Sequence, residues 1–291
     1  MGYRLKKSIN VSDLTSHLGL KFCGNNVEVI GVTTLADQEV GFLVFAKESG
    51  KSSAGAVVVE PMSNDLEDVM DLNYTSIISD NPRLDFIRLL DFLENNIGFS
   101  TYEFESKIHE SAILGPNVVI ESGCIICENV IIEANTVIHS GTTIGANTRI
   151  RSCSSIGGDG FGFERLPDGT PLRFPHLGGV TIGENVEVGS CAAIARGTLS
   201  NTTIDSYVKI DNLVHIAHNV HVKKAAFIIA CAELSGGVEV GENAWVAPNS
   251  CTHQKIIIGD GAIVGLGAVV TTDIPTMTVF AGNPARKLKD I

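Results

Sequence analysis

Three histidines fall within one short segment of the chain, IDNLVHIAHNVHV, which contains His215, His218 and His221. A neutral histidine can accept a proton near neutral pH, and its ring nitrogens are also common metal ligands. The segment therefore predicts either a general base for catalysis or part of a metal site. Which of the two applies depends on how the backbone positions the three side chains.

The backbone is predicted from a six-residue period of branched aliphatic residues. The frame runs from Leu114 to Ile156, resumes at Ile182, slips by four residues between 195 and 203, and continues from Ile204 to Val270. Neither a helix nor a two-faced strand has this period, whereas a three-sided solenoid does, with one hexad per face and the aliphatic residue pointing inward. Glycine after the aliphatic residue, as in IGAN, is expected where the chain turns a corner. Small or β-branched residues two positions before the aliphatic are also expected inside: Thr136, Thr142, Thr148 and Ser154.

The period divides the chain into three parts. Residues 1–105 lack it and predict a small α+β domain, residues 106–275 form the solenoid with an excursion loop at 157–179, and residues 276–291 are a C-terminal tail. In the first part, SINVSDLTSHLGLKF predicts a capped short helix with Ser12 or Asp13 near its start, GFLVFA and GAVVVE predict strands, and NPRLDFIRLLDFLENN predicts an amphipathic helix. This domain either binds substrate or only covers one end of the solenoid.

Composition excludes several classes of function. The net charge of −12 argues against non-specific binding to nucleic acid. No run of 18 apolar residues predicts a membrane span, and the start, MGYRLKKSIN, has no apolar signal segment. Seven scattered cysteines fit a reducing, cytoplasmic location, and Cys124 and Cys127 are interpreted as packing residues because no second pair or histidine pair completes a zinc site.

The order of motifs along nearly the whole chain resembles one enzyme family. ISDNPRLDFIRLL is followed by hexads, IGGDGFGF, HLGGVTIGENVEVG and IDNLVHIAHNV, as in the UDP-3-O-(3-hydroxyacyl)glucosamine N-acyltransferases, which are hexapeptide-repeat acyltransferases. The resemblance implies a mainly β protein with a left-handed parallel β-helix after a small α+β domain. It also implies a homotrimer with active sites between subunits, and transfer of an acyl group from a thioester to the amine of a nucleotide-linked amino sugar.

The hexad frame and the resemblance together assign roles to residues. In the frame, His215 and His221 point outward on successive faces and His218 lies near a corner, which disfavours a tri-histidine metal site within one subunit. His218 matches the family's catalytic histidine, and it is suited to accept the amine's proton. Gly236 lies one coil later and matches the family's oxyanion position. Candidate substrate-binding residues are Asp211, Asn212, Asn219, His215, His253, Phe42, Phe161 and Phe163, with Asp211 and Asn212 also candidates for orienting the imidazole.

The end of the chain suggests the acyl donor. VFAGNPARKLKDI is similar to the ending of sugar acetyltransferases that use acetyl-CoA, and no helical extension follows Ile291. We therefore expect acyl-CoA as co-substrate, with Gly265, Gly267, Arg286 and Lys287 at the donor site and the two cations holding phosphates.

Three alternatives stay open from the sequence. The first is a lipid A pathway enzyme that uses acyl carrier protein and an already O-acylated UDP-glucosamine. The second is a trimeric zinc hydratase similar to carbonic anhydrase, for which His176, His215, His218 and His221 supply nitrogen ligands. The third is a non-catalytic trimeric scaffold. The acyltransferase motifs cover far more of the sequence than either of the last two, so no bound metal is expected.

Overall fold

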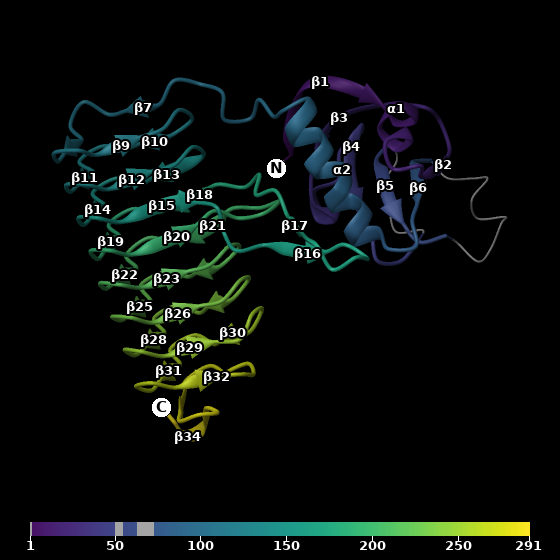
Figure 1. Cartoon of the computed structure of the whole chain (residues 1–291). Coiled ribbons are helices and arrows are strands. Elements are labelled where there is room, and N and C mark those ends of the chain that lie inside the picture. Colours follow the sequence, from purple (N-terminus) through teal and green to yellow (C-terminus); the bar gives the residue numbers. More distant parts are fainter. Residues whose placement is uncertain (1, 50–54, 63–72) are drawn as a thin grey trace. The chain divides into compact units, whose positions relative to one another are not determined.

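A computed structural model describes residues 2–49, 55–62 and 73–291 of the chain, which form two compact units (Figure 1). The first unit contains the chain up to Thr101 together with Gly162–Leu177, and the second contains Tyr102–Phe161 and Gly178–Ile291. The central part of the excursion loop expected at 157–179 therefore belongs to the first unit. No helix among the described residues is both long and apolar enough to cross a membrane.

The first unit is built on a six-stranded sheet with the order β1-β3-β4-β5-β6-β2. The four central strands run parallel, and the outer strands β1 and β2 pair antiparallel with β3 and β6. The elements are β1 (Tyr3–Asn10), α1 (Val11–Ser16), β2 (Lys21–Cys23), β3 (Glu28–Val32), the 3-10 helix η1 (Leu35–Asp37), β4 (Phe42–Phe45), β5 (Val57–Glu60), β6 (Thr75–Ile78), α2 (Pro82–Asn96) and the hairpin strands β16 (Phe163–Arg165) and β17 (Pro171–Arg173).

Helix α2 begins and packs as its sequence predicts. Asn81 caps the helix by accepting a hydrogen bond from the backbone N–H of Leu84, and Pro82 occupies the first turn, where no N–H is needed. The helix contacts β4 and β5, and its buried apolar side chains are Leu84, Phe86, Ile87, Leu89, Leu90 and Leu93. Helix α1 begins at Val11, so Ser12 and Asp13 lie near its start as expected, but the residue at the cap position, Asn10, makes no side-chain capping hydrogen bond.

The second unit is a parallel β-helix with three faces, and strands that follow one another along the chain lie on successive faces. The first face has β7 (Lys107–Ile108), β10 (Ile125–Ile126), β13 (Thr142–Ile144), β18 (Val180–Ile182), β21 (Thr202–Ile204), β24 (His221–Val222), β27 (Glu239–Val240) and β30 (Ile257–Ile258). The second has β8 (Ile113–Leu114), β11 (Ile131–Ile132), β14 (Arg149–Ile150), β19 (Glu187–Val188), β22 (Lys209–Ile210), β25 (Phe227–Ile228), β28 (Trp245–Val246), β31 (Ile263–Val264), β33 (Thr278–Ala281) and β34 (Arg286–Asp290). The third has β9 (Val119–Ile120), β12 (Val137–Ile138), β15 (Ser155–Gly158), β20 (Ala193–Ala195), β23 (His215–Ile216), β26 (Glu233–Leu234), β29 (Cys251–Thr252) and β32 (Val269–Val270).

The interior of the β-helix is the column of aliphatic residues that the six-residue period predicts. From Ile126 to Val270 the aliphatic positions of the frame are buried, and so are the threonine and serine positions two residues before them. Leu114 and Ile120 are exceptions, since Leu114 is 42% exposed and Ile120 is half-buried. Their strands lie at the edge of their sheets, so no further coil covers that end of the column.

The corners of the β-helix depend on asparagine more than on glycine. In IGAN, the residue with positive φ is Asn147 at +57°, and seven further asparagines occupy equivalent left-handed corner positions. Asparagine tolerates this conformation better than most residues with a side chain. Gly145 instead serves a close approach between coils, because a Cβ there would lie 2.6 Å from the carbonyl carbon of Gly183. Glycine therefore lies in the corner as expected, while Asn147 is the residue there that adopts the left-handed conformation.

The last sixteen residues extend the β-helix. They were expected to be a tail, but β33 adds to the second face beside β31, and β34 pairs antiparallel with β33.

Candidate active site

A cavity of about 460 Å³ opens on the third face of the β-helix. Its walls come from β23, β26 and β29 and from the turns that follow them, together with a short segment that follows β15. The lining residues are Gly160, Phe161, His215, Ala217, His218, Glu233, Ser235, Gly236, Thr252, His253 and Gln254. Three of the eight histidines of the chain thus meet in one hollow.

His218 and Gly236 are neighbours in this cavity, as their spacing of one coil predicts. The backbone N–H of Gly237 donates to the carbonyl oxygen of His218, with N and O 2.9 Å apart, and this bond joins the two turns. A Cβ on Gly236 would lie 2.8 Å from both Cε1 and Nε2 of the His218 ring. Gly236 therefore presents its backbone directly to the imidazole, and no larger residue fits without moving the ring.

The other nitrogen of His218 faces Asn219. Nδ1 of His218 lies 2.9 Å from Oδ1 of Asn219. Asn219 is in turn hydrogen-bonded to Thr198 and Ser200, which belong to the loop between β20 and β21. Asn219, which was expected to bind substrate, is thus in contact with the candidate base.

The remaining histidines of the segment divide between two faces. His215 is exposed on β23 beside Glu233 of β26, and both line the cavity. His221 lies on β24 of the first face, where its Nε2 is 3.1 Å from a carboxylate oxygen of Asp205. Among the described residues, no three histidine, cysteine, aspartate or glutamate side chains gather closely enough to hold a metal ion. His176 lies in the first unit, buried with Nδ1 2.8 Å from the carbonyl oxygen of Phe174.

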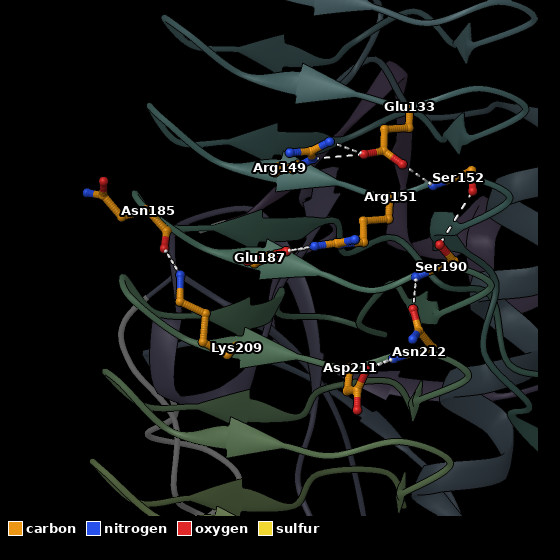
Figure 2. Close-up of polar contacts among 10 residues, drawn as sticks. All are labelled: Glu133, Arg149, Arg151, Ser152, Asn185, Glu187, Ser190, Lys209, Asp211 and Asn212. Atoms are coloured by element: carbon orange, nitrogen blue, oxygen red, sulfur yellow. Dashed lines mark hydrogen bonds and ion pairs between the residues drawn. The ribbon is translucent and has the colours of Figure 1, made fainter.

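Asp211 and Asn212 lie at a different corner, between the second and third faces. Figure 2 shows them at the end of a column of polar contacts that runs along this corner and the adjoining second face. Asp211 accepts from the backbone N–H of Asn212 at 2.7 Å, and Asn212 accepts from that of Ser190 at 2.8 Å. Neither residue lines the cavity around His218, so the structure does not bring them to the imidazole.

The three aromatic candidates have different environments. Phe161 lines the cavity and is 90% exposed. Phe163 is in the first unit on β16, with the guanidinium of Arg173 over its ring. Phe42 is 1% exposed and packed in the first unit, where a Cβ on Gly31 would lie 2.4 Å from its ring. Stacking of a nucleotide base on Phe42 would require that packing to open.

The four candidate donor residues lie near the C-terminal end of the β-helix. Gly265 approaches Ala281 so closely that a Cβ would lie 2.6 Å from the Ala281 side chain, and Ala281 pairs with Arg286 across β33 and β34. Gly267 is a corner residue with φ +60° and open space around its Cβ position. Lys287 is next along β34, with its ammonium 2.7 Å from Asp290. Arg286, Lys287 and Lys289 of β34 are all exposed.

Glu233, Ser235 and Gln254 line the cavity but were missed in the sequence. The hydroxyl of Ser235 donates to the carboxylate of Glu233 at 3.1 Å. The hexad frame contained a signal for them, because Glu233 lies one coil after His215, Gln254 two coils after His218, and Ser235 one coil after Ala217, the residue before His218.

Comparisons with known proteins find relatives along nearly the whole chain. The family model of the bacterial transferase hexapeptide (six repeats) matches residues 105–140 and 126–158. The UDP-3-O-acylglucosamine N-acyltransferase of Campylobacter lari is 32% identical over 306 residues, which cover 97% of this chain and 95% of that protein. UDP-3-O-acylglucosamine N-acyltransferase 1 of Sulfurimonas denitrificans is 34% identical over 301 residues, which cover 95% and 93%. A crystal structure of a UDP-N-acetylglucosamine acyltransferase has a TM-score of 0.51 at 21% identity, covering 62% of this chain and 70% of that chain.

The family model and the near-full-length relatives define the class, a hexapeptide-repeat transferase, and the solved structure supports the left-handed parallel β-helix that the sequence resemblance implied. Identity along nearly the whole length then defines the group within that class. The chain belongs to the UDP-3-O-acylglucosamine N-acyltransferase family. It is therefore an acyltransferase enzyme, as expected from the sequence.

Proposed function

We propose that this enzyme transfers an acyl group from a phosphopantetheine thioester to the amine of UDP-3-O-acylglucosamine, in the lipid A pathway. Of the two acyltransferase readings of the sequence, the names of the near-full-length relatives favour this one over a CoA enzyme for an unspecified amino sugar. The main support for the proposal is that, in a chain of this family, His218 lies against Gly236 and both residues line an open cavity.

The chemistry requires a proton acceptor. The nitrogen lone pair of the neutral amine attacks the thioester carbonyl carbon, a C–N bond forms, and the C–S bond breaks to release the thiol. The nitrogen loses one proton in the reaction: Nε2 of His218 accepts it as the amine becomes the amide, and His218 then passes it to the departing sulfur to form the free thiol. Transfer is direct, with no acyl group on the protein.

The tetrahedral intermediate also needs a hydrogen-bond donor for its oxygen. In the described part of the chain, the backbone N–H of Gly236 makes no hydrogen bond to a protein acceptor. It lies beside the imidazole, so one carbonyl carbon can be within reach of both groups. Gly236 is therefore our candidate for the oxyanion donor.

Substrate contacts follow from the lining of the cavity. Phe161 supplies an exposed apolar ring for an acyl chain, and His215, Glu233 and His253 supply polar groups for the sugar hydroxyls. The donor's phosphates are assigned to Arg286 and Lys287. CoA and acyl carrier protein carry the same phosphopantetheine arm, so both sources share this chemistry.

The proposed assembly is a homotrimer with active sites between subunits. It rests on the family resemblance and on the outward position of His218 on a single chain. Light scattering at assay concentrations tests it, and a fully active monomer would contradict it.

The reaction is tested by mass spectrometry of products with two acceptors and two donors. UDP-3-O-acylglucosamine should gain one acyl group in an amide, whereas UDP-N-acetylglucosamine, whose nitrogen is already acylated, should gain none there. The same acyl group is offered on CoA and on acyl carrier protein in parallel reactions. Turnover with either donor supports the proposal and identifies the source. No amide with either donor contradicts it.

A further inference from the structure

The side-chain amide of Asn219 can be oriented from its hydrogen bonds alone. One amide atom is 3.2 Å from the backbone nitrogen of Thr198 and 2.9 Å from its hydroxyl, and the other is 3.0 Å from the carbonyl oxygen of Ser200. A backbone N–H only donates and a carbonyl oxygen only accepts. The atom facing Thr198 must therefore be Oδ1, and the atom facing Ser200 must be Nδ2. The usual ambiguity between the two amide atoms does not arise here.

This orientation determines where the proton of His218 lies. Nδ1 of His218 is 2.9 Å from Oδ1 of Asn219, which can only accept. The hydrogen bond therefore requires a proton on Nδ1. Because neutral imidazole carries one ring proton, Nε2 has the lone pair. Nε2 is the ring nitrogen beside Gly236.

The two residues that orient Asn219 come from the four-residue slip in the hexad frame. A regular coil would carry the chain from Ile194 to the next inward aliphatic in six residues, but here the next is Ile204. The added residues form a tight loop, since a Cβ on Gly197 would lie 1.6 Å from the carbonyl oxygen of Ser200. The carbonyl oxygens of Gly197 and Thr198 both accept from the backbone N–H of Gly178.

The backbone of Asn219 is held by the same segment. Its N–H donates to the hydroxyl of Thr202 at 2.9 Å. Its φ is +61°, a conformation that glycine, asparagine and aspartate tolerate. Backbone and side chain of Asn219 are thus both fixed by residues 198–202.

We propose that the loop formed by residues 195–203 is a positioning device that holds His218 as the Nδ1–H tautomer through Asn219. Thr198 and Ser200 are positioning residues, and they act on the reaction only through the imidazole. The proposal deepens the proposed function, because it rests on His218 being the base that uses Nε2.

Imidazole ¹⁵N NMR of the histidine-labelled enzyme tests the tautomer without any substrate. The chain has eight histidines, and the signals of His218 are assigned from their absence in His218→Gln. At a pH where the ring is neutral, the wild-type signals should show a protonated Nδ1 and an unprotonated Nε2. A His218 that is protonated at Nε2 instead would overturn the inference, whatever the activity.

Two substitutions of Asn219 that its positive φ allows give a matched pair. Asn219→Asp keeps an acceptor oxygen for Nδ1–H and should keep the tautomer, whereas Asn219→Gly removes the acceptor and should lose it. The glycine variant should lower kcat by roughly 10- to 100-fold with little change in KM, because the base is mispositioned and binding is intact. Equal tautomer populations in the two variants would contradict the proposal.

The loop is tested with a double variant that removes both hydroxyls, Thr198→Val with Ser200→Ala. The two backbone bonds to the amide remain, so we expect a partial loss of the Nδ1–H form and a several-fold fall in kcat, which Thr198→Ser in the same background should partly restore. Unchanged NMR signals and unchanged kcat would overturn the role of the loop. If wild type shows the expected tautomer but no acyl transfer, the proposed function fails while the tautomer assignment stands.

Discussion

The backbone of Gly236 lies against the imidazole of His218, so that a Cβ at Gly236 would be 2.8 Å from Nε2. The φ of Gly236 is outside the left-handed region that favours glycine. Space beside the ring, not backbone conformation, is therefore what requires glycine at this position. The two residues are one coil apart, and the regular stacking of coils brings them together.

Gly236→Ala should lower kcat while leaving the fold intact. The added methyl group must push the His218 ring away from the carbonyl position, and we expect a loss of roughly 100-fold, comparable to the contribution of positioned proton transfer. Steady-state kinetics with the natural donor and acceptor measures it. Gly158→Ala is the matched control, because its Cβ would meet its nearest neighbour at 3.4 Å, an ordinary contact. Full activity of Gly236→Ala would show that catalysis does not require the His218 imidazole in its observed position.

Ile144→Asp should prevent folding of the β-helix. Ile144 is 0% exposed in the aliphatic column, where a carboxylate would have no partner and no water. Circular dichroism and gel filtration would detect the loss. Ile257→Asp is the control, since Ile257 points outward from the same face and is 48% exposed. A folded, cooperative Ile144→Asp protein would mean that the inward frame is wrong.

Substitution of Arg286 and Lys287 by alanine should raise the KM for the thioester donor by about tenfold and change kcat little. Phosphate contacts are made equally in the ground state and the transition state, so their loss weakens binding without slowing the chemical step. The two residues are adjacent on β34. Lys289→Ala, on the same strand, is the control. If KM is unchanged for both the CoA and the carrier-protein donor, these cations are not part of the donor site.

Glu133→Gln should reduce stability at neutral pH and not at low pH. The hydrogen bond from Arg149 is the main cause that lowers the pKa of Glu133, with a further contribution from the backbone N–H of Ser152 (Figure 2). A carboxylate with a depressed folded-state pKa stabilises the protein above its unfolded-state pKa, and that stability is lost as pH falls through the folded-state value. The pair is partly exposed, so we expect a loss of about 0.2–1 kcal/mol at pH 7.

Urea unfolding followed by the fluorescence of Trp245, the only tryptophan, measures this difference at neutral and acidic pH. Glu110→Gln, at an exposed glutamate of the same unit, is the control. A stability loss of the same size at both pH values would rule out the ion pair as its source.

The fold was predictable because the period of the aliphatic residues is itself the geometry of the coil. Each face of the coil takes six residues, so Ile138 and Ile144, which are six residues apart, occupy equivalent inward positions on successive faces. The same rule predicted that Gly236 stacks on His218, since no insertion separates their two coils. No sequence period predicts that Phe42 packs against Gly31, because the first unit has no repeat and its packing depends on contacts between distant segments.

The site could not be completed from the sequence where the repeat is interrupted. Asp211 and Asn212 are close to His218 along the chain. Six residues carry the chain from one corner of the β-helix to the next, so Asp211 and Asn212 lie at a different corner from His218. Thr198 and Ser200 reach Asn219 only because the inserted loop turns back on itself. The path of such a loop depends on its own hydrogen bonds, which the six-residue frame does not describe.

The turnover of His218→Ala tests the central claim most directly. Amide formation on UDP-3-O-acylglucosamine is measured by mass spectrometry, with His221→Ala as the control because that imidazole pairs with Asp205 on another face. We predict that His218→Ala folds like the wild type and loses roughly 10²- to 10⁴-fold in kcat, while His221→Ala stays close to wild type. A folded His218→Ala enzyme with wild-type turnover would contradict the assignment of His218 as the general base.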